Sequence, residues 1–287
     1  MNDIARSQPK SGLAIGCHAL VEARLSEIGS LRDQASPPGC PPLPPRFLRH
    51  ADEHTVVGLH AVLAALATHP GQPVVGGHGI VAAPCQAGRI VGAQTLAAFS
   101  SGGAVTVSPH VVPQCSLHSV AGAVSVALGM HGPHLGVGGG PEALGEGLLV
   151  ASSFMAGGGD PDCTGMWLVA TEWGDEPRLD AAGLPQNDPC CRGLALLLEP
   201  VPEPDDGGEH VAPLAFDMRM TRLARGPRLP AAGGSLVALA TALDMCREGG
   251  ALASWAVSCP GGGEIRVCSR LRRPASWTGQ PAVRGAA

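Results

Sequence analysis

The sequence predicts an α/β fold in which helices cover both faces of a layered sheet. Short apolar runs alternate along the chain with longer segments of helical periodicity. Glycine and proline, at 41 and 27 residues, punctuate the boundaries between these runs. A sheet with helices packed on its faces is the architecture that this alternation favours.

The predicted strands are the apolar runs. MWLVAT at 166–171 and GLALLLE at 193–199 are the clearest, because each is nearly continuous in apolar residues, as strands buried on both faces are. The other predicted strands or extended pieces are residues 12–24, 73–83, 104–107 and 134–137, and a C-terminal hairpin over 254–259 and 264–270.

The predicted helices have apolar residues three or four positions apart. The first runs from Arg46 and ends at His69-Pro70-Gly71, with Leu59, Leu63 and Leu66 on one face. The other predicted helices are residues 86–100, 116–128, 141–155, with proline tolerated in the first turn, and 235–247. The proline-rich segments predicted as irregular are a loop at 36–45 and a linker at 200–209, and the tail from Arg272 is expected to fray.

Composition excludes several classes of function. The formal net charge of −5 and the absence of tyrosine argue against a nucleic-acid-binding surface. No apolar run reaches the length of about 18 residues that a membrane span needs, and no signal peptide is indicated at the N-terminus. The ten cysteines are scattered and include no C-x-x-C pair. They are therefore expected to be reduced and mostly buried, in a cytoplasmic protein.

Residues 46–200 carry a series of short motifs in a fixed order. They are His118 with Ala121-Gly122, Leu128-Gly129 followed by Gly132-Pro133, Gly159-Asp160-Pro161-Asp162, a buried strand ending at Glu172, and Gly193 to Glu199. This order resembles the N-terminal half of the β-ketoacyl synthases, enzymes that have the thiolase fold. The resemblance implies a synthase-like domain over 46–200. Residues 1–45 would precede it as a strand and a proline-rich loop, and residues 201–287 would follow as a linker with a short helix-plus-hairpin extension.

The chain departs from the synthases at the residues that do the chemistry. Counted from Gly132-Pro133, the position of the family's nucleophilic cysteine falls at Pro141, which has no thiol, hydroxyl or amine to hold an acyl chain. Active synthases also use two histidines from their C-terminal half, whereas this chain has only His210 after His134. The chain is also too short for a second full thiolase half, so we expect a truncated fold without enzymatic activity of its own.

Noncatalytic members of the family exist. They are the chain-length factors, which pair with an active synthase and shape its acyl tunnel. The resemblance therefore implies a chain-length-factor-like subunit in fatty acid, polyene or polyketide assembly. Its expected partners are a catalytic ketoacyl synthase subunit and an acyl carrier protein that reaches the complex, and no cofactor or metal is expected.

The residues around the bend after 134–137 are expected to have structural or interface roles. The bend Gly136–Gly140 is expected to be a close-packing element, and the helix from Glu142 to Met155 to lie near the tunnel or the subunit interface. The complete set is His118, Gly122, Gly132, Pro133, Gly138, Gly139, Gly140 and Glu142.

Two alternative hypotheses would give this chain a catalytic or ligand-binding site. Cys115 opens the predicted helix CSLHSVAGAVSVAL, and a thiol at a helix N-terminus would have a lowered pKa, as an acyltransferase or condensing nucleophile needs. The loop Gly136–Gly140 fits a dinucleotide-binding pattern between a strand and a helix, although Pro141 removes one amide donor. A metal site at His50 and His54 has less support, because two histidines four apart are more typical of a solvated helix face.

Overall fold

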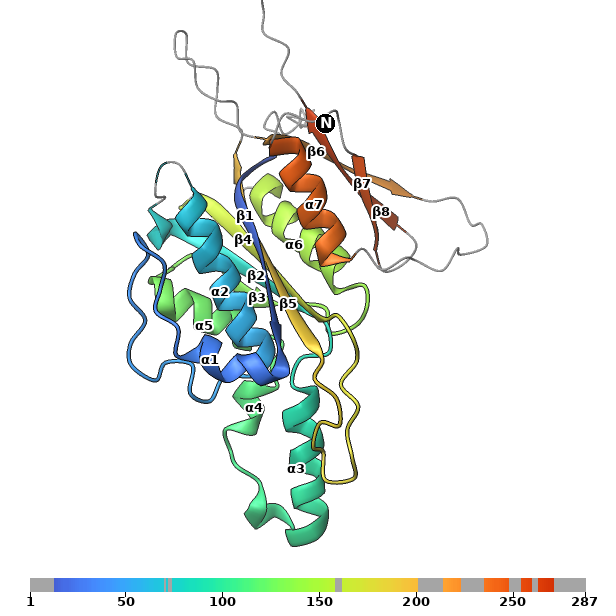
Figure 1. Cartoon of the computed structure of the whole chain (residues 1–287). Helices are drawn as coiled ribbons and strands as arrows, with labels where there is room; N and C mark the ends of the chain where they lie inside the picture. The colour runs from blue at the N-terminus through green and yellow to red at the C-terminus, as the bar shows by residue number, and fades with distance from the viewer. Residues whose placement is uncertain are drawn as a thin grey trace, which may run out of the picture.

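One mixed sheet runs through the part of the chain that the computed structural model describes, namely residues 13–69, 71, 74–157, 162–200, 214–222, 235–247, 254–259 and 263–270. Its strand order is β3-β2-β4-β5-β1-β6-β8-β7 (Figure 1). The strands are β1 (Leu13–Arg24), β2 (His78–Pro84), β3 (His134–Gly136), β4 (Gly165–Trp173), β5 (Cys190–Pro200), β6 (Leu214–Arg222), β7 (Ser254–Cys259) and β8 (Gly263–Arg270). Strand β2 pairs in parallel with β3 and β4, and the other pairings are antiparallel.

Helices cover both faces of this sheet, which confirms the predicted fold class. The helices are α1 (Ile28–Arg32), α2 (Glu53–Thr68), α3 (Arg89–Gly102), α4 (Val111–Gln114), α5 (Ser119–Leu128), α6 (Ala143–Gly157) and α7 (Leu236–Arg247). On one face α1, α2 and α5 pack in one apolar cluster, and on the other α6 and α7 pack in a second. Helices α3 and α4 instead extend beyond the end of the sheet (Figure 1).

The central strands are buried on both faces because their side chains alternate between the two clusters. In β4, Trp167 and Val169 pack toward α2 and α5, whereas Met166 and Leu168 pack toward α6 and α7. All four side chains are completely buried. This explains why the sequence of β4 is almost continuously apolar, as predicted.

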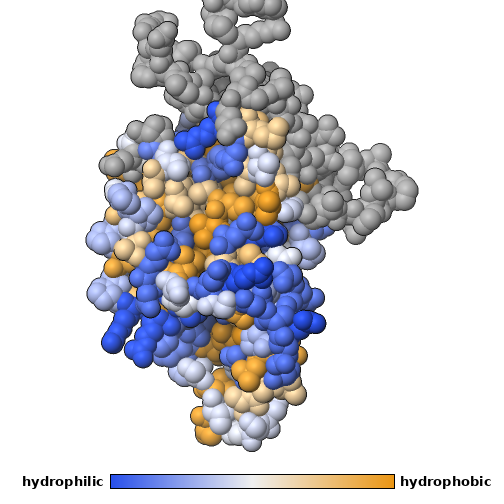
Figure 2. All heavy atoms as spheres, in the orientation of Figure 1, coloured by the Kyte–Doolittle hydropathy of each residue, from blue (hydrophilic) through white to orange (hydrophobic). Residues whose placement is uncertain are grey.

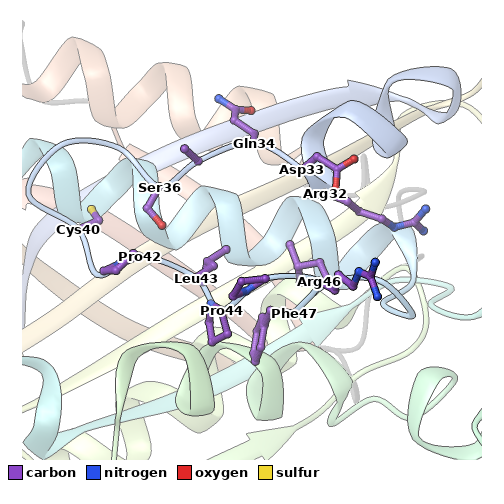
Figure 3. A pocket seen from close by; sticks show the side chains of 13 residues that line it. Arg32, Asp33, Gln34, Ser36, Cys40, Pro42, Leu43, Pro44, Arg46 and Phe47 are labelled. Atoms are coloured by element: carbon purple, nitrogen blue, oxygen red, sulfur yellow. The ribbon is translucent and has the colours of Figure 1, made fainter.

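The proline-rich segment predicted as a loop is irregular in the structure. It curves over α2 and encloses a cavity of about 370 Å³, with Cys40 toward one end and Arg32 and Arg46 toward the other (Figure 3). The Cys40 thiol donates to the Leu63 carbonyl at 3.3 Å, and Arg32 Nη2 donates to the Ala51 carbonyl at 2.9 Å. The first bond holds the loop against α2, and the second joins the end of α1 to the segment just before α2.

Three element predictions need correction. Helix α2 begins at Glu53 rather than near Arg46, because the Asp52 carboxylate accepts the Thr55 amide at 2.8 Å and caps the helix there. Residues 104–106 form a 3-10 turn and not an extended piece. Strand β2 begins at His78, after a 3-10 turn over Val75–Gly77, and not at residue 73.

The sheet joins parts of the chain that lie far apart in sequence. Strand β1 lies between β5 and β6, so the N-terminal strand and the C-terminal strands belong to the same sheet as the central segment. Strand β6, which was not among the predicted strands, connects β1 to the predicted hairpin of β7 and β8. Of the linker predicted at 200–209, Pro200 is the last residue of β5 and the rest lies outside the described residues, as do the tail from Arg272 and most of the Gly159–Asp162 motif.

Helix α2 begins with a buried acid that makes stability depend on pH. Glu53 is 7% exposed, and burial raises the pKa of its carboxyl. A carboxyl whose pKa is higher in the folded chain than in the unfolded one stabilises the fold at pH below the unfolded-state pKa. That stabilisation is lost as the pH rises through the folded-state pKa.

We therefore predict that Glu53→Gln removes part of the loss of stability that the wild-type protein shows on raising the pH from about 5 to about 8. Chemical denaturation across this range measures it. The exposed Glu176 provides the control, since Glu176→Gln should keep the wild-type pH dependence. Identical pH dependence in Glu53→Gln and wild type would contradict the prediction.

Candidate functional site

The bend between β3 and α6 is fixed by hydrogen bonds to the end of β2. The Val137 amide donates to the Ala82 carbonyl at 2.8 Å, the Gly139 amide to the Pro84 carbonyl at 3.0 Å, and the Gln86 amide to the Gly139 carbonyl at 3.1 Å. Gly138 and Gly139 have φ values of 85° and 104°, which side-chain-bearing residues rarely adopt. The bend therefore needs glycine to turn the chain from strand to helix.

Pro141 lies two residues before α6, at the wall of a small cavity of about 150 Å³. Both β2 and β4 end at this cavity, and α6 begins there. Its lining residues are Ala83, Cys85, Pro141, Ala143, Leu144, Ala170, Thr171, Glu172, Trp173 and Leu236. The residue predicted to replace the nucleophile is itself exposed and borders this partly open cavity, to which its ring offers no nucleophilic atom.

Cys85 is the thiol among the residues that line this cavity, and it was not predicted as a site residue from the sequence. Burial raises the pKa of the Cys85 thiol, and the nearby Glu172 carboxyl raises it further. The thiol is therefore protonated at neutral pH and is a poor nucleophile. A sequence signal existed, because Cys85 directly follows the buried strand β2.

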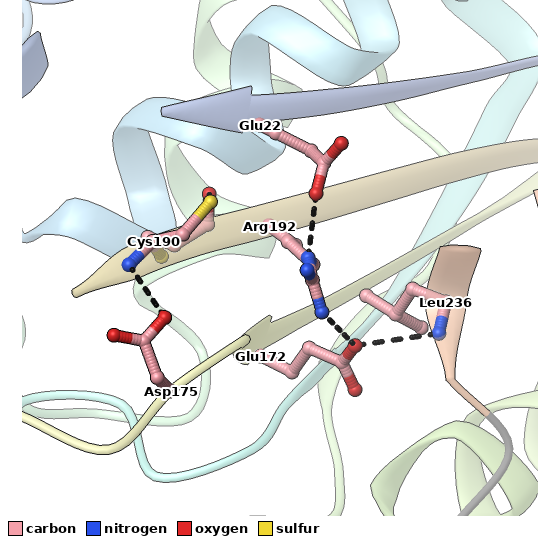
Figure 4. A network of polar contacts seen from close by, with 7 residues as sticks. Glu22, Glu172, Asp175, Cys190, Arg192 and Leu236 are labelled. Atoms are coloured by element: carbon pink, nitrogen blue, oxygen red, sulfur yellow. Dashed lines mark hydrogen bonds and ion pairs between the residues drawn. The ribbon is translucent and has the colours of Figure 1, made fainter. Parts of the chain in front are cut away.

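Glu172 is the acid of the cavity and has a structural role. Burial raises the pKa of its carboxyl, while a hydrogen bond from the Leu236 amide at 3.3 Å and the nearby Arg192 guanidinium lower it. Arg192 lies between two acids, with Nε 2.6 Å from Glu22 Oε1 and Nη1 3.8 Å from Glu172 Oε1 (Figure 4). This row connects β1, β5 and β4 to the start of α7.

Cys115 does not lie at a helix N-terminus, which corrects the alternative built on it. It follows the last residue of α4, and its amide donates to the Val111 carbonyl at 2.9 Å, while α5 begins only at Ser119. Burial and the acids Asp52 and Glu53 raise the pKa of the Cys115 thiol instead of lowering it. The structure therefore does not supply the activation that a nucleophile at Cys115 requires.

The structure brings the predicted interface residues together around β3. His118 precedes α5, and its ring lies 5.3 Å from that of His134, while the Gly122 amide donates to the His118 carbonyl at 2.8 Å. At the Gly132-Pro133 turn, the Gly132 amide donates to the His78 carbonyl and the Ile80 amide to the Pro133 carbonyl. Glu142 follows Pro141, and its carbonyl accepts the Glu146 amide in the first turn of α6.

Several backbone amides in and just after the bend donate hydrogen bonds to carbonyl groups of the protein itself. Besides those of Val137 and Gly139, the Ala143 amide donates to the Gly140 carbonyl at 3.0 Å. A dinucleotide site on this loop would need such amides free to bind a pyrophosphate. Their engagement argues against the dinucleotide alternative.

His54 is completely buried, contrary to the solvated helix face expected for it. Its Nδ1 lies 2.8 Å from Thr171 Oγ1, and its ring contacts Trp173 edge-on at 5.4 Å. Burial lowers the pKa of the His54 imidazole, with Asp52 opposing the shift. His50 precedes α2 and stacks on His110, and no group of three potential metal ligands occurs among the residues that the structure describes.

The comparisons with known proteins rest on the fold. No protein-family model matches the sequence, and no curated protein does. The structure matches a chain of the ketosynthase ApeO–chain length factor ApeC complex from Xenorhabdus doucetiae, with 17% identity and a TM-score of 0.53. It also matches a chain of the ishigamide ketosynthase/chain length factor, with 16% identity and a TM-score of 0.58.

Both matches extend over almost all of each chain. They cover 90% and 91% of this chain and 99% of the respective solved chain. The solved chains are therefore comparable in length to this one. Among the residues that the structure describes, no helix is long and apolar enough to cross a membrane.

We predict that Gly138→Ala lowers the free energy of unfolding by more than about 2 kcal/mol. The added Cβ would lie 2.6 Å from the Ala143 Cβ, at a φ that disfavours alanine. The control is Gly140→Ala, where a Cβ meets no atom within 4 Å, and its effect should stay within about 0.5 kcal/mol. Urea denaturation measures both, and equal effects would contradict this account of the bend.

The β-bend-α arrangement around Pro141 therefore lies in a thiolase-like α/β fold, the fold that this chain shares with the ketosynthase/chain length factor proteins.

Proposed function

We propose that this chain is a cytoplasmic, noncatalytic, chain-length-factor-like subunit that assembles with a catalytic ketosynthase in polyketide or related acyl-chain synthesis. The fold shared with two ketosynthase/chain length factor proteins supports the ketosynthase-like part of this proposal. The observation that carries the noncatalytic part is Pro141, at the position where the synthases have their nucleophilic cysteine.

The other groups near Pro141 support the same proposal. Cys85 lines the cavity beside Pro141, Cys115 is the alternative nucleophile, and burial raises the pKa of both thiols. Claisen condensation begins with a thiolate that accepts the acyl chain, so protonated thiols do not start it. In this proposal the partner synthase supplies the nucleophile, and an acyl carrier protein delivers the chain to the complex.

This chain would contribute surfaces rather than reacting groups. Helix α6 begins at the cavity beside Pro141, and Ala143 and Leu144 from its first turn line that cavity. We assign this helix and the residues around β3 to the acyl tunnel or the subunit contact. The close-packed bend would hold them in a fixed position relative to the sheet.

We predict that the chain co-purifies in a fixed ratio with a ketosynthase of the same organism when the two are co-expressed, and that only the pair condenses acyl thioesters. Affinity purification followed by a condensation assay measures both. A chain that binds none of these synthases, or that condenses acyl thioesters alone, would contradict the proposal.

Cysteine variants of the pair test the alternative nucleophiles. Cys85→Ala and Cys115→Ala should each leave the condensation rate of the pair within about twofold of wild type, because neither thiol is activated. If Cys115→Ala abolished condensation in a correctly folded pair, Cys115 would be a catalytic residue and this chain an enzyme.

A further inference from the structure

The cavity under the proline-rich loop has two buried polar atoms among the residues of its wall. Arg32 Nε and Ser36 Oγ are both buried, and neither has a hydrogen-bond partner in the part of the chain that the structure describes. Buried polar atoms nearly always have a partner, because an unpaired one gives up its hydrogen bonds to water without replacement. Two such atoms in one wall favour a polar molecule as the occupant of the cavity.

The same wall carries positive charge that no acid neutralises by direct contact. Arg32 and Arg46 both line the cavity, and neither forms an ion pair with another described residue. Asp33 is the one acid of the lining, so two cations against one anion leave a net charge of +1. Guanidinium groups bind carboxylates through paired, charge-assisted hydrogen bonds. The charge of the wall therefore suits a monoanion.

The two cations lie at the same end of the cavity. Figure 3 shows both guanidinium groups on one side of the loop, away from Cys40. Figure 2 shows strongly hydrophilic residues at the lower left of the face that it displays, on the side where Figure 1 draws this loop. A negatively charged group can therefore reach this end of the cavity from solvent.

The rest of the wall is mostly apolar. Leu43 and Phe47 pack against the core cluster of α2, and Leu48 belongs to that cluster. The prolines of the loop have a fixed φ, which makes their side of the wall rigid. The volume of about 370 Å³ lies within the range of about 300 to 1,000 Å³ that small-molecule sites have. The wall therefore suits a ligand that has an apolar body behind its charged group.

We propose that this cavity binds a small organic carboxylate, with the carboxylate at the end of Arg32 and Arg46 and the apolar body along the loop. A phosphate monoester fits less well, because Asp33 repels its second negative charge. The site goes beyond the function proposed above, since this cavity shares no lining residue with the cavity beside Pro141. A ligand held there stabilises the folded chain, because it binds the folded state in preference to the unfolded one.

The test titrates hexanoate into the full-length chain and measures binding by calorimetry. We expect saturable binding with a dissociation constant of about 1 mM or lower, as the small size of hexanoate allows. Hexanamide has the same body without the charge, and acetate has the charge without the body. Each should bind at least about 10-fold more weakly than hexanoate.

Arginine variants test the charged end of the site. Arg46→Gln should weaken hexanoate binding at least about 10-fold, because it removes an exposed cation of the wall. The matched control is Arg49→Gln, since Arg49 is also exposed but does not line the cavity, and its affinity should equal that of wild type. Arg32→Lys keeps the charge, removes the buried Nε donor and should weaken binding as well. Thermal unfolding establishes that each variant is folded.

Cys40 reports where the ligand lies. Its side chain lines the cavity, so bound hexanoate should slow the alkylation of Cys40 by iodoacetamide. Cys190 is a partly exposed thiol outside the lining and should keep its alkylation rate, which makes it an internal control. Peptide mass spectrometry measures both rates in the same sample.

Each outcome decides the proposal. Hexanoate binding that Arg46→Gln weakens and Arg49→Gln does not, together with protection of Cys40, supports it. No binding of hexanoate at about 10 mM, equal affinity for hexanamide, or wild-type affinity in Arg46→Gln would overturn it. Tighter binding of hexyl phosphate than of hexanoate would also overturn it, because the charged group would then be a phosphate. None of these measurements involves a synthase, so their failure leaves the proposed function standing.

Discussion

The hydrogen bonds between the bend after β3 and the end of β2 determine where Pro141 lies. The amides of Val137 and Gly139 donate to β2 carbonyls, and the two left-handed glycines let the chain turn from strand to helix within six residues. In a synthase such a turn would present a cysteine. In this chain Pro141 follows the bend and lines the cavity, and the function proposed above takes it as the replacement for that cysteine.

The surroundings of the bend favour neutral groups over charged ones. Burial raises the pKa of the thiols of Cys85 and Cys115 and of the carboxyl of Glu172, so each is held toward its protonated form. Arg192 is shared between Glu22 and Glu172 and connects the strands to the start of α7. Burial therefore disfavours the thiolate form of both cysteines, while the row of Glu22, Arg192 and Glu172 links elements of the fold.

Local patterns in the sequence were sufficient to predict the central strands and most helices, because strands such as β4 are apolar on both faces and helices such as α7 have regular apolar spacing. The place of Pro141, just after a short strand and a bend, could also be predicted from sequence. The strand and the bend between the Gly132-Pro133 turn and Pro141 are short, so counting residues from that turn was sufficient. Tertiary contacts determined the rest. The start of α2 depends on the Asp52 cap, and the burial of His54 depends on Thr171, which is 117 residues away. Cys85 joins the site only because β2 and β4 are neighbours in the sheet.

The central claim is that acyl chemistry does not start on this chain. It is tested most directly by incubating the purified chain, alone and with its synthase partner, with an acyl thioester and measuring the intact mass of each subunit. The account predicts an acyl adduct on the synthase and an unchanged mass for this chain. An acyl adduct on this chain that is released by hydroxylamine, as a thioester is, would contradict it.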